Sequence, residues 1–336
     1  MGEFDLIERY FKRAARVAGP TIALGIGDDC ALLQPTPGTQ LAISSDMLVE
    51  GRHFFPDVDP AALGHKALAV NLSDLAACGA KPLAFTLALA LPDATPAWLE
   101  PFSRGLLALA DEHHCALIGG DTTRGPLNIC ITVFGEVPIV NGKSCGLLRS
   151  GAQPGDDIYV SGTLGEARLA LDVLRGAVSV PAEVFARARL RLERPTPRVA
   201  LGRALRGIAT AAIDVSDGLL GDLSHILKAS GAGATVQIYS TMFLIANYLY
   251  RTWANDIFDG FITEEQALAY VLAGGDDYEL AFTAPASRRD AVLAAASVAG
   301  VQARRIGQID KQPGIRLVDG QGNVQPGGYA SFDHFG

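Results

Sequence analysis

Gly25-Ile26-Gly27-Asp28-Asp29-Cys30-Ala31 places two adjacent carboxylates between glycines and apolar residues. A pair of like charges in such a setting is costly unless a cation neutralises it. The glycines allow a tight turn and a close approach of the backbone to a ligand. Taken alone, the stretch is equally consistent with a surface turn, because Gly-Asp pairs are common turn residues. The recurrence of such stretches along the chain favours a role in ligand binding.

Aspartates recur at six places, each beside glycine, serine or small apolar residues. These are Asp28/Asp29, Asp46, Asp74, Asp121, Asp214/Asp217 and Asp276/Asp277. Carboxylates that converge on one cleft can bind several Mg²⁺ ions. Phosphoryl transfer requires such neutralisation, because the transferred group and both flanking oxygens carry negative charge. Together the six stretches predict a phosphate site with several metal ions.

Each of these stretches could also have a purely structural role, which the sequence leaves open. Ser44 and Ser45 precede Asp46 at the end of a short strand expected over residues 41–45, and a serine-rich strand end needs no metal. Asp74 lies in an almost wholly apolar helix expected over residues 60–79, where a nearby polar side chain can pair with it. The corresponding structural roles elsewhere are a packed histidine for His53, a strand-to-loop turn for residues 117–125, plain solvation for Arg149, and a helix N-cap for Ser216 or Asp217.

The composition is that of an acidic globular protein. The 336 residues are enough for two domains, and 49% of them are hydrophobic while 19% are charged. The formal net charge of -8 argues against general binding to nucleic acids or anionic membranes. An acidic protein that handles a phosphorylated ligand needs a cationic intermediary, and a divalent metal ion is suited to that role.

The cysteines and the hydropathy pattern predict a cytoplasmic protein that does not enter a membrane. The five cysteines form no close CxxC pair, and we interpret them as buried thiols in a reducing compartment. Residues 1–10 are amphipathic and include acidic side chains, unlike a signal peptide. No run of about 18 apolar residues, the length that spans a bilayer, is present.

Both halves of the chain mix predicted strands and helices. Helices are expected over residues 3–17, 60–79 and 95–114, and strands over residues 85–91, 128–137 and 158–161. Pro138 is expected to end its strand, because proline cannot donate to a ladder, and the glycines that follow it mark a connector. We therefore predict an α/β (α+β) subunit with an N-terminal mixed sheet over residues 1–140 and a C-terminal α/β domain over residues 141–336. Neither a Walker A sequence nor a GxGxxG fingerprint is present.

Seven motifs follow one another in an order that is typical of one enzyme family. They are GIGDDCA (25–31), SSDMLVEGRHF (44–54), LAVNLSDLAACGA (68–80), IGGDTTRG (118–125), SGTLGEA (161–167), AAIDVSDGLLGDL (211–223) and GGDDYEL (274–280). Over nearly the whole chain the sequence resembles the thiamine-monophosphate kinase family, which is related to the aminoimidazole ribonucleotide and selenophosphate synthetases. The resemblance implies ATP-dependent phosphorylation of thiamine monophosphate to thiamine diphosphate, with several Mg²⁺ ions. It also implies a homodimer in which the N-terminal ATP- and metal-binding domains meet, each C-terminal domain completing an active-site cleft.

The same resemblance implies roles for individual residues. The expected metal ligands are Asp29, Ser44, Ser45, Asp46, Asp74, Asp121, Asp214 and Asp217. The expected ATP contacts are Gly120, Asp121, Arg149 and Ser216, and the expected substrate contacts are His53, Asp276 and Phe332. The family typically has Glu at the position of Asp276, so this side chain is one methylene shorter. In the altered C-terminal tail, Tyr329 could replace Phe332 as the aromatic contact of thiamine.

The resemblance also sets expectations for the mechanism. The acceptor is itself a phosphate whose oxygen is anionic at pH 7, so neither a general base nor a covalent phospho-enzyme is expected. Metal ions and Arg149 are expected to bring the two anions together for in-line attack on the γ-phosphorus. Two further functions stay open from the sequence: a sister ATP-dependent synthetase with a different substrate, and a non-catalytic nucleotide or metal sensor.

Overall fold

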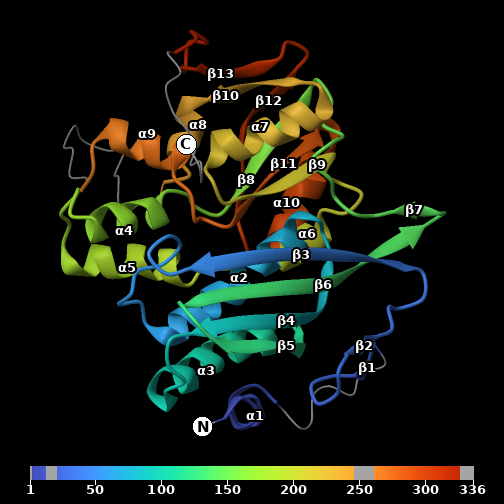
Figure 1. The fold of residues 1–336 in the computed structure, drawn as a ribbon. Helices are drawn as coiled ribbons and strands as arrows, with labels where there is room; N and C mark the ends of the chain where they lie inside the picture. Colours follow the sequence, from blue (N-terminus) through green and yellow to red (C-terminus); the bar gives the residue numbers. More distant parts are fainter. Residues whose placement is uncertain (1, 13–20, 246–260, 326–336) are drawn as a thin grey trace. The chain divides into compact units, whose positions relative to one another are not determined.

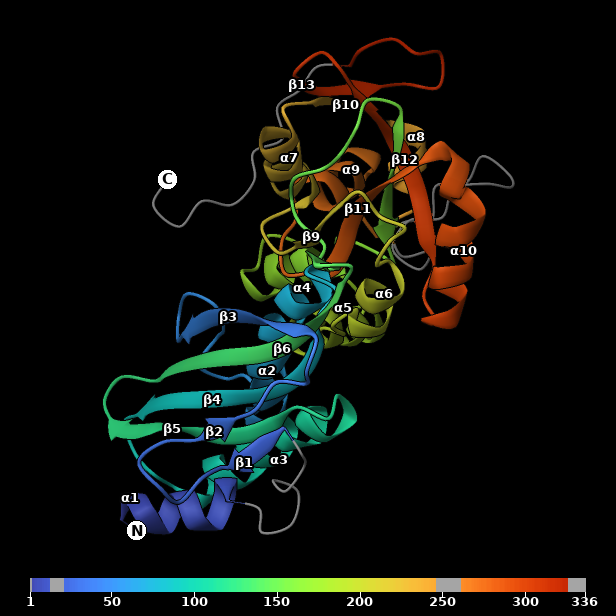
Figure 2. The same cartoon turned by 90° about the vertical axis from the view of Figure 1, so that its right-hand side faces the viewer.

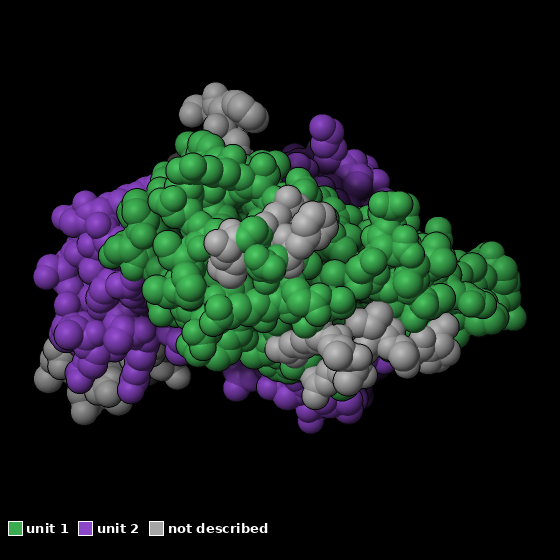
Figure 3. Space-filling view, turned by 60° about the horizontal axis from the view of Figure 1, so that its bottom comes forward, with its two compact units in different colours: residues 1–75, 80–146 green, residues 76–79, 147–336 purple. Residues whose placement is uncertain are grey.

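The computed structural model describes residues 2–12, 21–245 and 261–325 (Figure 1). The chain divides into two compact units, residues 1–75 with 80–146 and residues 76–79 with 147–336, which are coloured separately in Figure 3. Each unit combines a sheet with helices, so the predicted α/β class is confirmed. None of the helices in the described ranges has both the length and the apolar character needed to span a bilayer.

The first unit is built around a mixed sheet. Its strands are β3 (Thr39–Val49), β4 (Lys81–Leu91), β5 (Ala116–Arg124), β6 (Asn128–Val140) and β7 (Lys143–Ser144), while β1 (Ile22–Leu24) and β2 (Leu32–Leu33) form a separate pair. The strand order is β3-β6-β4-β5, and β7 pairs with β6 beside this path. β4 and β5 are parallel, whereas β3 and β4 are each antiparallel to β6. The mixed N-terminal sheet predicted from the sequence is therefore confirmed.

Helices α2 (Pro60–Ala77) and α3 (Pro96–Glu112) supply much of the buried surface of this unit. Leu68, Leu72 and Leu75 of α2 recur at helical spacing and are almost completely buried. The N-terminal segment forms α1 (Glu3–Leu6) and the π-helical turn η1 (Ile7–Phe11), and the backbone becomes extended at Lys12. The helix expected to reach residue 17 therefore ends at Phe11, and residues 13–17 lie outside the described ranges.

Three strands of this sheet are longer than expected. β3 continues through Asp46 to Val49, because all eleven of its residues pair with β6. β5 continues through the Gly-Gly-Asp sequence that was expected to form a turn, because its pairing with β4 extends to Arg124. β6 passes Pro138 and ends at Val140; the prediction that proline stops it is wrong. The pairing of β6 with β4 already ends at Glu136, so no ladder bond from Pro138 is needed on that side.

The second unit contains a six-stranded sheet in the order β13-β10-β12-β8-β11-β9 among its described residues. The strands are β8 (Asp156–Ser161), β9 (Ala211–Val215), β10 (Gly233–Gln237), β11 (Glu279–Pro285), β12 (Ala303–Asp310) and β13 (Gly314–Val318). The helices are α4 (Glu166–Leu174), α5 (Ala182–Glu193), α6 (Val199–Ala204), α7 (Leu219–Ser230), α8 (Ile238–Met242), α9 (Glu264–Ala273), η2 (Ala286–Arg288) and α10 (Arg289–Val298). In Figure 2, α7 and α10 lie to either side of β11 and β12. The sheet is mixed, because β10 and β13 are parallel while the other neighbours are antiparallel.

Strands β8 and β9 of this sheet are buried on both faces, although β9 is the last strand in the order. Every residue of β8 and of β9 is buried, which explains why both read as short apolar runs in the sequence. Two acidic motifs, residues 214–218 and residues 274–278, lie at neighbouring ends of β9 and β11. The 214–218 motif ends β9, and the 274–278 motif leads into β11, which pairs with β9. The topology therefore places the two motifs side by side.

Candidate active site

In the first unit, β3 and α2 bring two of the predicted ligands together. The Ser44 hydroxyl donates a short hydrogen bond to a carboxylate oxygen of Asp74. The backbone N–H of Asp46 donates to the Asn71 side-chain oxygen over 3.0 Å. Ser44 and Asp46 are two residues apart on one strand and so share its helix-facing side. This group of Ser44, Asp46 and Asp74 offers the hard oxygen atoms that Mg²⁺ prefers.

The opposite face of the sheet carries two more of the predicted ligands, Ser45 and Asp121. Ser45 is exposed, and its hydroxyl lies 3.0 Å from the Thr132 hydroxyl on β6. Asp121 is exposed and lies in the cross-strand row that runs through Ala88 and ends at Met47. Residues in one row share a face, and alternate residues of a strand face opposite ways. Within one subunit, Ser45 and Asp121 therefore do not join the group formed by Ser44, Asp46 and Asp74.

Gly120 occupies a position that no other residue can fill without distortion. Its φ is +143°, and an added Cβ would lie 1.8 Å from the backbone oxygen of Leu87. The glycine is thus required by the close approach of β5 to β4, whatever its relation to a nucleotide.

Asp29 and His53 lie in turns of the first unit. Asp29 is exposed and its backbone N–H donates to the Asp28 side chain over 2.9 Å. His53 follows β3, and its Nδ1 accepts a 3.0 Å hydrogen bond from the Val49 N–H, which fixes the ring near the strand end. Within the described ranges, no three His, Cys, Asp or Glu side chains are grouped so that they alone could hold a metal ion.

In the second unit, the 214–218 motif is shaped by a residue that the sequence analysis did not assign to the site. One carboxylate oxygen of Asp222 accepts the backbone N–H groups of Ser216, Asp217 and Gly218, over 3.0, 3.1 and 3.1 Å. The expectation that Ser216 or Asp217 caps α7 is wrong: Gly218 is the N-cap residue and no side chain caps the helix from that position. Burial raises the pKa of Asp222 to about 7, even though the backbone N–H bonds act in the opposite direction.

The 274–278 motif is fastened to the same loop through backbone contacts. The N–H groups of Asp276 and Tyr278 donate to the carbonyl oxygens of Ser216 and Val215, over 2.8 and 2.9 Å. Asp276 and Tyr278 both have positive φ, 64° and 52°, a strained conformation of the kind that clusters at functional sites. A Cβ on Gly275 would lie 2.5 Å from the Ser216 carbonyl oxygen, so the backbones of the two loops pack closely at this glycine. The structure thus brings Asp276 close to the loop of Asp214, Ser216 and Asp217.

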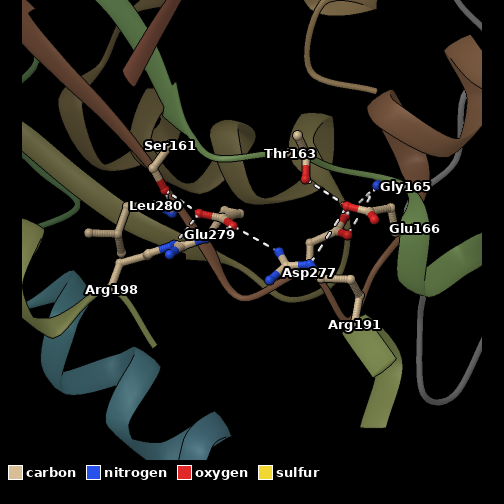
Figure 4. A network of polar contacts seen from close by, with 9 residues as sticks. All are labelled: Ser161, Thr163, Gly165, Glu166, Arg191, Arg198, Asp277, Glu279 and Leu280. Carbon is tan, nitrogen blue, oxygen red and sulfur yellow. Dashed lines mark hydrogen bonds and ion pairs between the residues drawn. The ribbon is translucent and has the colours of Figure 1, made fainter. Parts of the chain in front are cut away.

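A buried ionic network includes Asp277 of this turn and Glu279, which follows it at the start of β11 (Figure 4). Glu279 is completely buried and accepts hydrogen bonds from Arg191, Arg198 and the Ser161 hydroxyl, over 2.8, 2.6 and 2.6 Å respectively. Asp277 accepts the Gly165 N–H over 3.0 Å, and its burial raises the pKa of the Asp277 carboxyl well above its usual range. Removing a partner from such a network leaves a buried charge uncompensated, which is strongly destabilising.

The predicted contacts of the second unit differ in how far they are buried. Asp214 is buried at the end of β9, whereas Ser216 and Asp217 are half-buried. Arg149 is exposed, and its carbonyl oxygen accepts a 3.4 Å hydrogen bond from the Ser230 hydroxyl. Phe332 and Tyr329 lie outside the described residues. Asp222 and Glu279 were the residues that sequence reasoning missed; each belongs to a quoted motif, but its role depends on contacts that spacing alone does not reveal.

Comparison with known proteins gives the class to which this fold and these two acidic clusters belong. The family model of the AIR synthase related protein N-terminal domain matches residues 27–137, and that of the C-terminal domain matches residues 153–320. The chain is therefore an AIR synthase related protein in both of its parts.

The particular family follows from full-length relatives. A thiamine-monophosphate kinase from Salmonella typhimurium is 46% identical over 99% of this chain and 96% of its own length. The crystal structure of thiamine-monophosphate kinase from Stenotrophomonas maltophilia K279a superposes with a TM-score of 0.81 at 46% identity, covering 94% of this chain and 96% of that one. AaThiL, solved in complex with AMPPCP and TMP, has a TM-score of 0.71 at 27% identity, covering 88% of each chain. This chain belongs to the thiamine-monophosphate kinase family.

Proposed function

We propose that the protein transfers the γ-phosphate of ATP to thiamine monophosphate and so forms thiamine diphosphate. The observation that carries this proposal is the near-full-length identity to thiamine-monophosphate kinases. The AaThiL complex with AMPPCP and TMP supports ATP and thiamine monophosphate as the two substrates. The acidic clusters of the two units supply the oxygen ligands that a metal-dependent phosphoryl transfer requires.

The side chains present fit Mg²⁺ in their chemistry. Ser44, Asp46 and Asp74 would hold metal ions in the first unit, and Asp214 and Asp217 would do so in the second. Mg²⁺ in such sites is typically held by one or two carboxylates, with water and substrate phosphates completing its coordination. Clusters of fewer than three carboxylates therefore agree with this role. When bound, the ions would neutralise charge on the transferred phosphoryl group.

Substrate contacts complete the proposal. Asp276 is held in its strained turn by two backbone bonds, and the Tyr278 hydroxyl donates to its carboxylate over 3.2 Å. These bonds orient the Asp276 carboxylate so that it can accept a hydrogen bond from the substrate, although its side chain is one methylene shorter than the Glu that is typical of the family. His53, Arg149, Ser216, Gly120 and Phe332 keep the substrate and nucleotide roles that the resemblance implies.

We also propose a homodimer that forms through the exposed face of the first unit. β3 ends the sheet among the described strands, and Leu41, Ile43 and Met47 expose apolar side chains at alternate positions along it. An exposed apolar edge strand is a liability that proteins normally cover. Because Ser45 and Asp121 lie on this same face, a dimer formed through it places both at the interface. A cytoplasmic location is consistent with the five free thiols and remains part of the proposal.

The test is ADP formation from MgATP with and without thiamine monophosphate. The expected result is turnover that depends on thiamine monophosphate and disappears when EDTA removes the metal. Thiamine and an aminoimidazole ribonucleotide precursor serve as control acceptors. Turnover with the aminoimidazole ribonucleotide precursor alone would indicate a sister synthetase, and nucleotide binding without any turnover would indicate a sensor.

A further inference from the structure

The loop formed by residues 216–218 presents three consecutive backbone N–H groups to one point. Such a row of amides is the geometry that binds phosphate groups at glycine-rich loops and helix N-termini. Here the point is already occupied, because the Asp222 carboxylate accepts all three bonds over 3.0 to 3.1 Å. Asp222 lies in the first turn of α7 and is 3% exposed. These amides are therefore not available to a nucleotide phosphate.

The consequence for the loop is conformational. Three bonds to one buried acceptor fix the backbone of Ser216, Asp217 and Gly218, and thereby the directions in which the two side chains leave it. The same loop accepts the N–H groups of the 274–278 turn through the Val215 and Ser216 carbonyl oxygens. Asp222 thus fixes the 216–218 loop directly and the 274–278 turn through that loop.

We propose that Asp222 is a positioning residue, whose carboxylate holds the 216–218 backbone in the conformation that presents Ser216 and Asp217 to the nucleotide and its metal ion. The inference rests on the proposed function, since the roles of Ser216 and Asp217 come from it. Asp222 would act through this loop, by fixing the backbone of Ser216 and Asp217, and not by contact with either substrate.

Two substitutions of Asp222 change the number and the strength of the hydrogen bonds that its side chain accepts from the 216–218 loop. Asp222→Asn keeps an oxygen that can accept the three N–H groups, but without charge. Asp222→Leu has a similar size and accepts none. Asp156→Asn is the matched control, because Asp156 is also buried in the second unit and accepts the Gln153 N–H and the Thr210 hydroxyl, over 2.9 and 2.7 Å. Asp156 makes no contact with the 216–218 loop among its hydrogen bonds.

The primary measurement is calorimetric titration of the full-length chain with AMPPCP and Mg²⁺, which needs no turnover. We expect Asp222→Leu to weaken binding about tenfold or more, as the loss of one well-ordered contact does. We expect Asp222→Asn to weaken it less, about threefold, because the amide oxygen still accepts hydrogen bonds from the loop but more weakly than a carboxylate oxygen does. The KM for MgATP should rise in the same order, and by more than the KM for thiamine monophosphate, because Asp222 bonds directly to the 216–218 loop and reaches Asp276 only through the backbone bonds between the two loops. Asp156→Asn should leave MgATP binding unchanged.

Wild-type affinity for AMPPCP and Mg²⁺ in the folded Asp222→Asn and Asp222→Leu variants would overturn the positioning role. If Asp222→Leu does not fold, Asp222→Asn decides alone, and an unchanged KM for MgATP contradicts the proposal. Equal weakening in Asp156→Asn would also contradict it, because the effect would then be general destabilisation. The turnover assay of the wild type tests the proposed function separately from the role of Asp222. If the wild type shows no turnover, the proposed function is contradicted, but the dependence of nucleotide binding on Asp222 is not.

Discussion

Asp74 lies in α2, where most neighbouring side chains are small or apolar, and its carboxylate is close to the Ser44 hydroxyl of β3. We expect Asp74→Asn to lower turnover at least about a hundredfold at a fixed Mg²⁺ concentration, since the amide cannot replace the charge that neutralises a transferring phosphoryl group. The fold should survive, because the side-chain oxygen that accepts the Ser44 bond is kept. Steady-state rates and thermal unfolding measure the two effects separately.

Asp59 provides a control on the same helix. Its side chain accepts the Ala62 N–H over 2.9 Å at the start of α2, a capping bond that asparagine makes equally well. Asp59→Asn should therefore match the wild type in rate and in stability. A near-normal rate in Asp74→Asn would contradict a metal site at β3 and α2.

Gly119 and Gly120 are adjacent in β5 but differ in what surrounds them. A Cβ at Gly120 meets the Leu87 backbone at 1.8 Å, whereas at Gly119 the nearest atom is a Thr86 methyl group at 3.9 Å. We expect Gly120→Ala to destabilise the protein by about 3 kcal/mol, from overpacking and a positive φ. Gly119→Ala should change stability by less than about 1 kcal/mol. Urea midpoints measure both, and equal losses would show that the strand approach is not what requires Gly120.

Asp157 links β8 to β12 and α10 through hydrogen bonds from Arg305 and Arg289. Burial alone would raise the pKa of the Asp157 carboxyl, but hydrogen bonds from Arg289 and Arg305 outweigh it and hold the pKa below its usual value. A depressed pKa in the folded state stabilises it above the unfolded pKa, and this stabilisation is lost as the pH falls through the folded value. Asp157→Asn should therefore destabilise the protein at pH 7, and the difference should shrink below about pH 4, where aspartate begins to be protonated in the unfolded chain.

Thermal unfolding at a series of pH values tests this dependence. The exposed ion pair between Asp93 and Arg124, with a separation of 3.7 Å, is the control, because screened surface pairs contribute little. Asp93→Asn should show almost no effect at any pH. A difference for Asp157→Asn that stays constant from pH 7 to pH 3 would contradict the assigned cause.

Helices and strands could be predicted from the sequence where the pattern lies within one segment. They were harder to predict where an element depends on pairing with a strand that is distant in the sequence. The helix expected over residues 60–79 is present as Pro60–Ala77, because its apolar spacing and the flanking residues are properties of the segment itself. Gly119 and Gly120 read as a turn, yet they lie in β5, since pairing with β4 overrides local propensity. Asp222 was missed for the same reason: a side chain that bonds backward to a loop leaves no periodic pattern. The acidic motifs themselves could be located from sequence, but not their division between the two faces of the first sheet.

The net charge of -8 on the protein must be reconciled with the binding of two anionic substrates. Repulsion between the acidic clusters and the phosphates would oppose binding unless metal ions intervene. The acids are therefore not a general surface property but the reason for the expected metal dependence.

The proposed homodimer depends on the row of exposed apolar side chains on β3. Ile43 is 60% exposed, and burying a carboxylate there without a partner would cost several kcal/mol per subunit. We expect the wild type to have twice the protomer mass by light scattering at micromolar concentration, and Ile43→Asp to be monomeric. Leu190 on α5 is similarly exposed, at 57%, so Leu190→Asp should remain dimeric. A dimeric Ile43→Asp variant would exclude this face, whereas loss of both dimer and turnover in Ile43→Asp would be consistent with Ser45 and Asp121 acting at the subunit interface.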